Sequence, residues 1–238
     1  IGKSTTKLLR EKGAKVTNFD LNKDGKISDN FYSLDLRNSN KIEKIFLKAI
    51  QKHGCPDVFI NCSYPVYGEW HKASFKDVKK KLIYENINLH LGSCVLISRL
   101  IAEQMRKKKR EGSIINFSSI YGVVGQNLNI YEKTNIRENI IYNPIKGGII
   151  SYTKQLASYY GKFNIRANCI SPGGILGHVK NFKKKQDANF IKNYKKQNPM
   201  KRLAKPEEIA SVVIFLSSNA SSYVNGINLV VDGGWTSI

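Results

Sequence analysis

Short apolar runs rich in β-branched residues alternate along the chain with longer segments in which apolar residues recur at helical spacing. Runs of the first kind are typical of buried strands, and segments of the second kind are typical of amphipathic helices. The pattern predicts strands at residues 15–20, 30–35, 57–62, 113–118, 165–171 and 227–234. It predicts helices at residues 2–12, 38–52, 74–105, 140–160 and 206–217.

Strands that alternate with helices predict the α/β fold class. The expected architecture is a single Rossmann-type domain with a doubly wound parallel sheet and helices on both faces. No internal repeat or Pro/Gly-rich linker divides the chain, so one domain is predicted over residues 1–238. Residues 125–139 and 176–199 are too long for ordinary connections, and such loops often cover a functional site.

The composition adds a strongly basic charge to this picture. The 238 residues carry a formal net charge of +21, with 41% hydrophobic and 24% charged residues. A basic surface can bind nucleic acid. Most of the basic residues, however, are lysines scattered among asparagines and isoleucines, and no nucleic-acid-binding motif accompanies them. We therefore expect a globular domain without a nucleic-acid partner.

Neither a membrane anchor nor a metal site is predicted. No apolar run approaches the roughly 18 residues that span a bilayer, and residues 1–15 lack the apolar centre of a signal peptide. We expect a cytoplasmic protein without membrane contact. The four cysteines have no CxxC spacing and no histidine cluster beside them, so reduced thiols are expected. They are Cys55, Cys62, Cys94 and Cys169.

Tyr142 and Lys146 form a YxxxK pair on the helix predicted over residues 140–160. A spacing of four residues places both side chains on one helix face. A neighbouring ammonium favours phenolate and lowers the pKa of a tyrosine, which could then act as general acid and base. Alone, the pair could also be a core tyrosine beside a surface lysine. Ser119 follows the strand at 113–118, where ligands bind in open α/β sheets, and its hydroxyl can donate to a substrate oxygen.

The motifs around these residues resemble the short-chain dehydrogenase/reductase (SDR) family, in the family's order and over nearly the whole chain. Ile1, Gly2 and the helix after them resemble the end of the TGxxxGxG loop and the first helix. The chain then has "INCSYP" where the family has NNAG, the turn "SPGGI", and the ending "KRLAKPEEIASVVIFLSSNASSYVNGINLVVDGGW". The resemblance implies an NAD(P)-dependent oxidoreductase that interconverts a secondary alcohol and a ketone.

The resemblance also implies a role for each site residue. Tyr142 would exchange a proton with the alcohol or ketone, and Ser119 would hold the substrate oxygen. Lys146 would bind the nicotinamide ribose and lower the pKa of Tyr142. The residues expected to contact the cofactor are Ile1, Gly2, Asp20, Asp35, Leu36, Asn61, Cys62, Ser63, Tyr142, Lys146, Pro172, Gly173 and Ile175.

Asp20 favours NAD over NADP as the cofactor. A carboxylate at the end of the second strand of such a sheet accepts hydrogen bonds from the adenine-ribose hydroxyls and repels a 2′-phosphate. Asp20 could instead be a solvated residue that begins the turn "DLNKDG", and Lys23 leaves NADP as the alternative.

Two positions depart from the family pattern. Cys62, Ser63 and Tyr64 replace the second Asn, the Ala and the Gly of NNAG, so Tyr64 either reshapes the pocket mouth or is a packed aromatic residue. An ungapped count places His90 at the position of the family's catalytic Asn, whereas Asn88 requires a two-residue shift. His90 could relay a proton, because imidazole titrates near neutrality, or it could pack within the helix.

Ser119 and Tyr142 lie 23 positions apart, roughly ten more than is usual in the family. We interpret residues 126–138 as a polar lid that selects the substrate, or alternatively as a surface loop at a subunit contact. This spacing, the sequence "YNPIKGG" and the altered NNAG motif resemble the bacterial flagellin-modification and surface-sugar oxidoreductase subgroup. A lysine-rich segment at 177–197 could attract a sugar phosphate or could be a solvated basic helix. Its lysines include Lys180, Lys183, Lys184 and Lys185.

The chain begins inside a family motif. Only Ile1 and Gly2 of the phosphate-binding loop precede the first helix. We expect that about a dozen or more residues, a central strand and most of the TGxxxGxG loop, precede Ile1 in the native protein. Without them we expect a gap in the middle of the sheet and weakened pyrophosphate binding.

Three functions remain open from the sequence. The leading hypothesis is an NAD-dependent oxidoreductase acting on a polar, sugar-like small molecule that could carry a phosphate. The alternatives are a 3-oxoacyl-thioester (carrier-protein) reductase and a catalytically silent nucleotide-binding scaffold. The family resemblance also implies a homodimer or homotetramer, assembled through the helices at 74–105 and 140–160.

Overall fold

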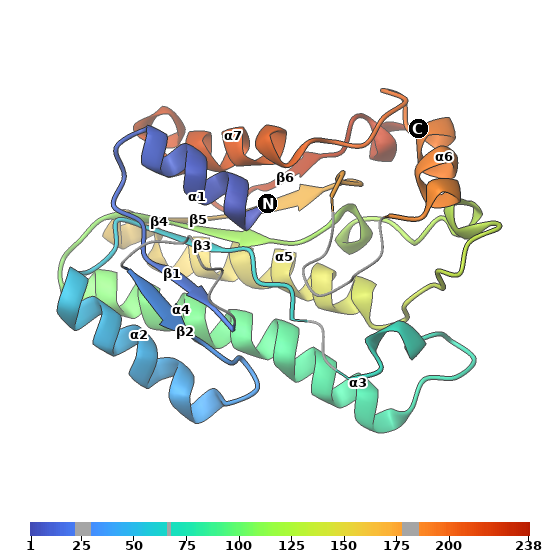
Figure 1. The fold of residues 1–238 in the computed structure, drawn as a ribbon. Coiled ribbons are helices and arrows are strands. Elements are labelled where there is room, and N and C mark those ends of the chain that lie inside the picture. Colours follow the sequence, from blue (N-terminus) through green and yellow to red (C-terminus); the bar gives the residue numbers. More distant parts are fainter. Residues whose placement is uncertain (22–29, 66–67, 178–185) are drawn as a thin grey trace.

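A computed structural model describes residues 1–21, 30–65, 68–177 and 186–238, and Figure 1 shows their arrangement. All six predicted strands are present. They are β1 (Asn18–Asp20), β2 (Phe31–Ser33), β3 (Val58–Asn61), β4 (Gly112–Phe117), β5 (Ile165–Pro172) and β6 (Asn228–Val231). The helices are α1 (Gly2–Glu11), α2 (Ser39–His53), α3 (Lys80–Ile87), α4 (Ser93–Lys107), α5 (Tyr142–Tyr160), α6 (Ala188–Gln197) and α7 (Pro206–Ser217).

The strands form two separate parallel sheets. Strands β3, β4, β5 and β6 pair in that order in a four-stranded sheet, and β1 and β2 form a two-stranded sheet. In the described part of the chain, no strand pairing joins the two sheets. The sequence predicts a gap in the sheet, and the division into two sheets agrees with that prediction. Parallel pairing brings the carboxyl ends of β3 to β6 to one edge, where ligands bind in such folds.

Successive residues of β4 face opposite sides of the sheet and bury two cores. Ile114 packs with Ile101 of α4 and Leu156 of α5. Ile115 packs on the other side with Ile209 and Val213 of α7. In Figure 1, α2, α4 and α5 form the layer below the strands, and α1 and α7 form the layer above. Helices on both faces of parallel strands confirm the predicted fold class.

The helix predicted over residues 74–105 begins later than expected and contains a π-helical turn. Helix α3 begins at Lys80, and a π-helical turn (Asn88–Gly92) separates it from α4. At the end of this turn the Ser93 hydroxyl donates to the Leu89 carbonyl oxygen at 2.5 Å, a side-chain bond to the preceding helical turn.

Helix α6 lies in a segment to which the apolar pattern assigns no helix of its own. The Asp187 carboxylate caps it by accepting hydrogen bonds from the N–H groups of Asn189 and Phe190, at 2.8 and 3.0 Å. Phe190 and Tyr194, four residues apart, pack into the same core cluster. An Asp cap followed by apolar residues at this spacing is a helix signal, which the many lysines of the segment obscure.

Three further observations concern the described residues as a whole. None of their helices has the length and apolar character needed to cross a bilayer. Their His, Cys, Asp and Glu side chains form no group of three or more that could hold a metal ion. All four cysteines are free thiols.

Candidate active site

The end of β4 and the helix α5 are joined by bonds that place the catalytic candidates. The Ser118 hydroxyl donates to the Lys146 carbonyl oxygen at 2.8 Å, and the Lys146 ammonium donates to the Phe117 carbonyl oxygen at 3.2 Å. Gly122 permits this approach, since a Cβ there would lie 2.7 Å from Oγ of Ser118 and 2.8 Å from the backbone carbon of Lys146. Ser119, just beyond the strand, is therefore held beside α5.

The start of α5 is fixed by Asn139. Its side-chain oxygen accepts hydrogen bonds from the N–H groups of Ile141 and Tyr142, each at 3.1 Å. These bonds satisfy backbone donors that have no partner within the first turn of the helix. Its side-chain nitrogen donates to the Trp70 carbonyl oxygen at 3.1 Å. One asparagine therefore ties Tyr142, the first residue of α5, to the segment that carries Trp70.

Tyr142, Ser119 and Lys146 lie together. Tyr142 hydrogen bonds with the Ser119 side chain, and the Lys146 nitrogen lies 5.7 Å from the centre of the Tyr142 ring. Lys146 is only 4% exposed, and burial lowers its pKa to about 8. The thiols of Cys169 and Cys94 act on this pKa, and no carboxylate of the described residues does. Lys146 is therefore a buried cation at neutral pH that lacks a counter-ion within the described structure.

The expectation that Lys146 lowers the pKa of Tyr142 is wrong for this structure. Burial raises the pKa of Tyr142, and the hydrogen bond with Ser119 offsets only part of that effect. The physical reason is desolvation of the phenolate, and Lys146 is not among the groups that act on this pKa. Tyr142 is thus a neutral phenol, which can donate a proton to a substrate oxygen held by Ser119.

His90, and not Asn88, lies in the group of side chains around Tyr142. Asn88 is exposed, whereas His90 is 5% exposed and stacks on Trp70 with ring centres 4.7 Å apart. The rings of Trp70 and Tyr64 each lie 6.3 Å, centre to centre, from the ring of Tyr142. The structure therefore places His90 beside Tyr142 and Asn88 at the surface, and which of the two takes the family's Asn role stays a prediction.

The interpretation of His90 as a proton relay near neutrality is wrong. Burial lowers the pKa of His90 to about 3, and the charge of Lys146 acts in the same direction. A hydrogen bond with the backbone of Pro65 acts in the opposite direction. The imidazole is therefore neutral throughout the physiological range and takes up no proton there.

Tyr64 combines both alternatives considered for it. Its hydroxyl accepts a hydrogen bond from the Trp70 indole N–H at 3.1 Å, and its ring lies 5.9 Å from the Lys146 nitrogen. The residue nevertheless stays 40% exposed. Tyr64 is therefore a packed aromatic residue that also forms part of the mouth of the site.

Ile1 and Gly2 begin α1 beside the end of β3. A Cβ on Gly2 would lie 3.1 Å from Sγ of Cys62, so the helix start touches the residue that follows β3. Asn61 ends β3, and its side-chain oxygen accepts a hydrogen bond from the Ser63 hydroxyl at 2.7 Å. A helix N-terminus favours phosphate, so this junction fits the pyrophosphate and adenosine parts of a dinucleotide.

Asp20 and Asp35 lie at the carboxyl edge of the two-stranded sheet. Asp20 ends β1 and is exposed. Asp35 binds Arg37 through both carboxylate oxygens, at 2.8 and 2.5 Å, and this bond lowers its pKa. A contact between Asp35 and an adenine amino group would therefore compete with Arg37. Leu36 packs against the core, and Lys23 lies outside the described residues.

The turn after β5 approaches an aromatic ring of the protein itself. Pro172 ends β5, and a Cβ on Gly173 or Gly174 would lie 2.7 Å from atoms of Tyr194. The Gly174 N–H donates to the Tyr194 hydroxyl oxygen at 2.6 Å, and Ile175 forms a parallel bridge to the segment before α7. The backbone of this turn therefore lies directly against the ring of Tyr194.

The insert at residues 126–138 is anchored at both ends. The Gln126 side chain exchanges two hydrogen bonds with the backbone of Asn139, at 3.1 and 3.3 Å. Arg137 pairs at 2.5 Å with an aspartate in the loop before α3. Between these anchors Ile130 is buried in the core. The polar-lid interpretation therefore applies only to the outer face of the insert, and the lid role stays a prediction.

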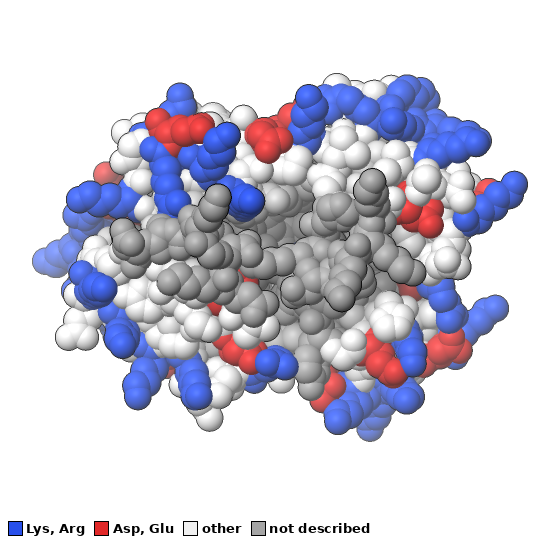
Figure 2. Space-filling model, in the orientation of Figure 1, with Lys and Arg blue, Asp and Glu red and all other residues white. Residues whose placement is uncertain are grey.

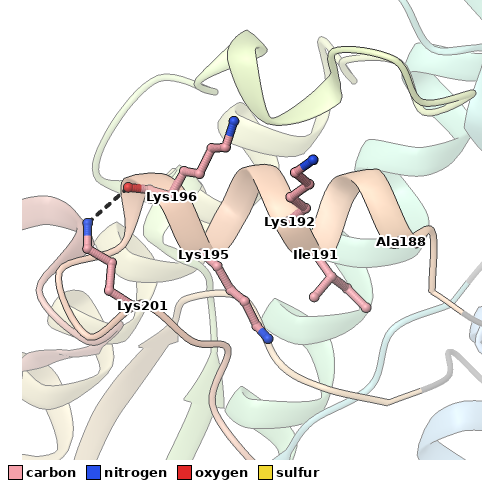
Figure 3. A pocket seen from close by; sticks show the side chains of 6 residues that line it. All are labelled: Ala188, Ile191, Lys192, Lys195, Lys196 and Lys201. Atoms are coloured by element: carbon pink, nitrogen blue, oxygen red, sulfur yellow. Dashed lines mark hydrogen bonds between the residues drawn. The ribbon is translucent and has the colours of Figure 1, made fainter.

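The basic charge is spread over the surface. Figure 2 shows lysine and arginine side chains around most of the visible face. Lys180, Lys183, Lys184 and Lys185 lie outside the described residues. A hollow of about 550 Å³ along α6, shown in Figure 3, is lined by Ala188, Ile191, Lys192, Lys195, Lys196 and Lys201. Lys195 points away from Lys192 and Lys196 in Figure 3, so these ammonium groups do not converge on one point.

Two residues of the site escaped the sequence reasoning. Trp70 begins a short 3₁₀ turn (Trp70–Lys72) and reaches Tyr142 only through tertiary packing, so no local pattern marks it. Asn139 had a signal, because an asparagine just before a predicted helix is a frequent cap. Both matter because they connect the segment around His90 to the start of α5.

Comparisons with known proteins agree with this geometry. A family model described as enoyl-(acyl carrier protein) reductase matches residues 1–236. The chain is 35% identical over 202 residues to "Post-translational flagellin modification protein A" of Campylobacter coli, across 85% of this chain and 76% of that protein. It is 31% identical over 247 residues to the 3-oxoacyl-[acyl-carrier-protein] reductase FabG of Thermotoga maritima, across 98% and 92%. A short chain dehydrogenase of Leptospira borgpetersenii, crystallised with bound NAD+, matches with a TM-score of 0.86 and 32% identity, across 99% of this chain and 88% of that one.

Proposed function

The chain belongs to the short-chain dehydrogenase/reductase family, and we propose that it is an NAD-dependent member which interconverts a secondary alcohol and a ketone on a polar, sugar-like substrate. As a member of the family it is an oxidoreductase that uses a nicotinamide cofactor. The proposal concerns which residues perform the reaction, the choice of NAD, and the substrate class.

The buried cation Lys146 beside Tyr142 carries the proposal. Burying a charge without a partner costs folding free energy, so packing alone explains this lysine poorly. The cofactor, when bound, supplies or accepts the hydride. Lys146 would bind its ribose hydroxyls, Ser119 would hold the substrate oxygen, and the neutral phenol of Tyr142 would donate its proton to that oxygen.

The choice of NAD rests on Asp20. The α1 start and the end of β3 fit the phosphate and adenosine parts of a dinucleotide, and Asp20 ends the neighbouring strand β1. A carboxylate there would accept the ribose hydroxyls and repel a 2′-phosphate. The solved Leptospira relative, which holds NAD+, supports the same choice at 32% identity.

The substrate class rests on similarity and on the aromatic site. The Campylobacter relative acts in flagellin modification by its name, which agrees with a sugar-like substrate. Aromatic rings around Tyr142, such as Trp70, suit the apolar face of a sugar while polar groups bind its hydroxyls. A phosphate on the substrate stays a prediction, since the lysines in the hollow along α6 do not converge.

A 3-oxoacyl-thioester reductase is the second candidate. The Thermotoga relative favours it by its name. The description of the matching family model shares only the carrier protein with this activity, because an enoyl reductase reduces a carbon–carbon double bond and not a ketone. That activity would be recognised by saturation with NADPH rather than NADH and by turnover of a 3-oxoacyl thioester. A nucleotide-binding scaffold, the third candidate, would transfer no hydride with either cofactor.

Tyr142→Phe tests the proposal. With NADH and a panel of keto sugars, this variant should lose about 10³-fold in kcat/KM, because it removes the proton donor. Tyr152→Phe is the matched control on the same helix, since the Tyr152 hydroxyl only donates to the Val95 carbonyl oxygen at 2.9 Å. It should keep full activity and lose about 1 kcal/mol of stability. Unchanged turnover in Tyr142→Phe would refute the catalytic assignment.

The assembly and location of the protein are part of the proposal. A homodimer or homotetramer would use α4 and α5, the long helices on one face of the sheet. Light scattering of the purified chain measures the subunit number. A cytoplasmic location stays a prediction.

A further inference from the structure

His90 carries a buried atom that the proposed catalytic steps do not use. The residue is 5% exposed, and its Nε2 atom has no hydrogen-bond partner in the part of the chain that the structure describes. Leaving a buried polar atom unpaired costs folding free energy, and most such atoms in folded proteins are paired. An unpaired atom inside the side-chain cluster of a reaction site therefore indicates that a ligand supplies the partner.

The other imidazole nitrogen determines what Nε2 can bind. The ring hydrogen bonds with the backbone of Pro65. Proline has no N–H group, so its carbonyl oxygen accepts and the imidazole donates. Because Nε2 is the unpaired atom, Nδ1 is the donor. A neutral imidazole protonated at Nδ1 has a lone pair at Nε2, so this atom accepts a hydrogen bond.

The groups around His90 keep its imidazole neutral, with the proton on Nδ1. Trp70 stacks on the ring at 4.7 Å, and the titratable Tyr64 meets it edge-on at 5.7 Å. Lys146 is the charged group that acts on the imidazole, and with burial it lowers the pKa of His90 to about 3. No carboxylate of the described residues acts on it. Nε2 is therefore an acceptor throughout the physiological pH range.

We propose that Nε2 of His90 accepts a hydrogen bond from a substrate hydroxyl group on the carbon next to the one that reacts. This inference rests on the proposed function, because it requires the reacting oxygen to lie between Ser119 and Tyr142. The rings of Tyr64 and Trp70 each contact the rings of both His90 and Tyr142, so the acceptor and the proton donor belong to one aromatic cluster. A substrate that reaches both groups has a hydroxyl beside its carbonyl, as an α-hydroxy ketone does.

A buried acceptor selects its substrate through the cost of a missing donor. A site built to bond a hydroxyl rejects the analogue that lacks it, because the protein atom then stays unpaired. We expect kcat/KM for an α-hydroxy ketone to exceed that for the matching plain ketone by about 10²-fold or more. In this role His90 determines specificity and transfers no proton.

Acetoin and butan-2-one are the matched probes, since they differ by one hydroxyl beside the carbonyl. His90→Phe keeps a ring against Trp70 but removes the acceptor. With NADH it should lower kcat/KM for acetoin by about 30- to 100-fold and leave that for butan-2-one within about threefold. His90→Gln places an amide oxygen near the position of Nε2 and should recover part of the loss. His90→Asn, whose oxygen reaches only as far as Nδ1, should not.

Equal losses for both ketones in His90→Phe would indicate a packing role and overturn the inference. Tyr142→Phe should instead abolish turnover of both ketones. If Tyr142→Phe keeps its turnover, the proposed function fails, whatever the result for the His90 variants.

Nitrogen-15 NMR of histidine-labelled protein, with NAD+ bound, gives a second measurement that needs no turnover. The pH is varied first, and each ketone is then added in turn. The His90 Nε2 signal should be that of an unprotonated nitrogen from pH 5.5 to 8, and it should move with acetoin but not with butan-2-one. No shift with acetoin, or equal shifts with both, overturns the inference even where neither ketone is reduced.

Discussion

The carboxyl edges of the two parallel sheets hold their polar side chains in opposite ways. At the end of β4, Ser119 and the facing Lys146 of α5 are buried, the Ser119 hydroxyl oxygen accepts a hydrogen bond from the Tyr121 N–H of its own turn, and the Lys146 ammonium donates to the Phe117 carbonyl oxygen. Beyond β2, Asp35 and Arg37 form an ion pair whose side chains are 35% and 51% exposed. Both edges belong to the proposed cofactor site, yet one is built by packing and the other by charge in contact with solvent.

The difference shows which part of the site depends on the fold. In the four-stranded region, burial lowers the pKa values of Lys146 and His90, and removing one partner leaves a buried group unpaired. In the two-stranded region, Arg37 lowers the pKa of Asp35, and water can replace either partner. We therefore expect large, specific effects at the first edge and small, salt-dependent effects at the second.

The largest expected effect is at Lys146. Lys146→Met removes a buried cation, so it should stop catalysis and stabilise the fold at the same time. kcat/KM should fall by about 10²- to 10⁴-fold. The free energy of unfolding at pH 7 should rise by about 1–2 kcal/mol, because the desolvation cost behind a pKa near 8 exceeds the value of the lost bond to Phe117. Steady-state kinetics and urea unfolding measure the two changes.

The pH dependence of stability supplies the check. The pKa of Lys146 is about 8 in the folded protein against an ordinary value of 10.5, so the unfolded chain binds more protons between these values. The free energy of unfolding of the wild-type protein should therefore rise between pH 8 and pH 10.5. The difference in stability between Lys146→Met and the wild-type protein should shrink over the same range. Lys154→Met, at an exposed position of the same helix, should change neither quantity. An advantage of equal size at pH 7 and pH 10 would contradict the burial argument.

The second largest effect is expected at Gly122. In Gly122→Ala the new Cβ would lie 2.7 Å from the Ser118 hydroxyl and 2.8 Å from the backbone of Lys146. The contact between β4 and α5 must then open, which should cost about 1–3 kcal/mol and displace the catalytic pair. Gly125→Ala is the control, because a Cβ there meets nothing within 4 Å. Urea midpoints that are equal for the two variants would mean that this junction is not tightly packed.

The same contrast explains how much could be predicted from the sequence. The strands and the grouping of Ser119, Tyr142 and Lys146 follow from local rules: apolar runs, the end of a strand, and a spacing of four on a helix. The stacking of His90 on Trp70 does not, because a 3₁₀ turn and a π-helical turn that are distant in the sequence bring these rings together. Local rules do not specify burial.

The pKa directions of the site depend on burial for the same reason. The sequence placed an ammonium near Tyr142 and an imidazole near the substrate, but it could not show that both lie away from water. Desolvation then raises the pKa of Tyr142 and lowers that of His90, opposite to the expectation for the first and far from neutrality for the second. At Asp35, which is only partly buried, the hydrogen bond with Arg37 has the largest effect on the pKa and lowers it.

The smallest expected effect is at Arg37. Because the pair with Asp35 is exposed, Arg37→Ala should cost about 0.5 kcal/mol or less at pH 7, and still less in 1 M salt. The pKa of Asp35 is lowered from 3.8 in the folded protein. A carboxyl of this kind stabilises the fold above its ordinary pKa, and the contribution is lost as the pH falls through the folded value. The difference between the variant and the wild-type protein should therefore be complete at pH 7 and decline below pH 3.8.

Arg110→Ala is the matched control, since Arg110 pairs with Asp57 at another exposed site and should show a loss of similar size. Urea unfolding at low and high salt measures both variants. A loss well above 1 kcal/mol for Arg37→Ala alone, insensitive to salt, would mean that the two-stranded edge is held as firmly as the four-stranded one. The distinction between a packed and a solvent-exposed half of the cofactor site would then fail. A small, salt-sensitive loss would instead mean that surface charges can be substituted on the adenosine side at little cost in stability, whereas substitutions on the proposed catalytic side have large effects.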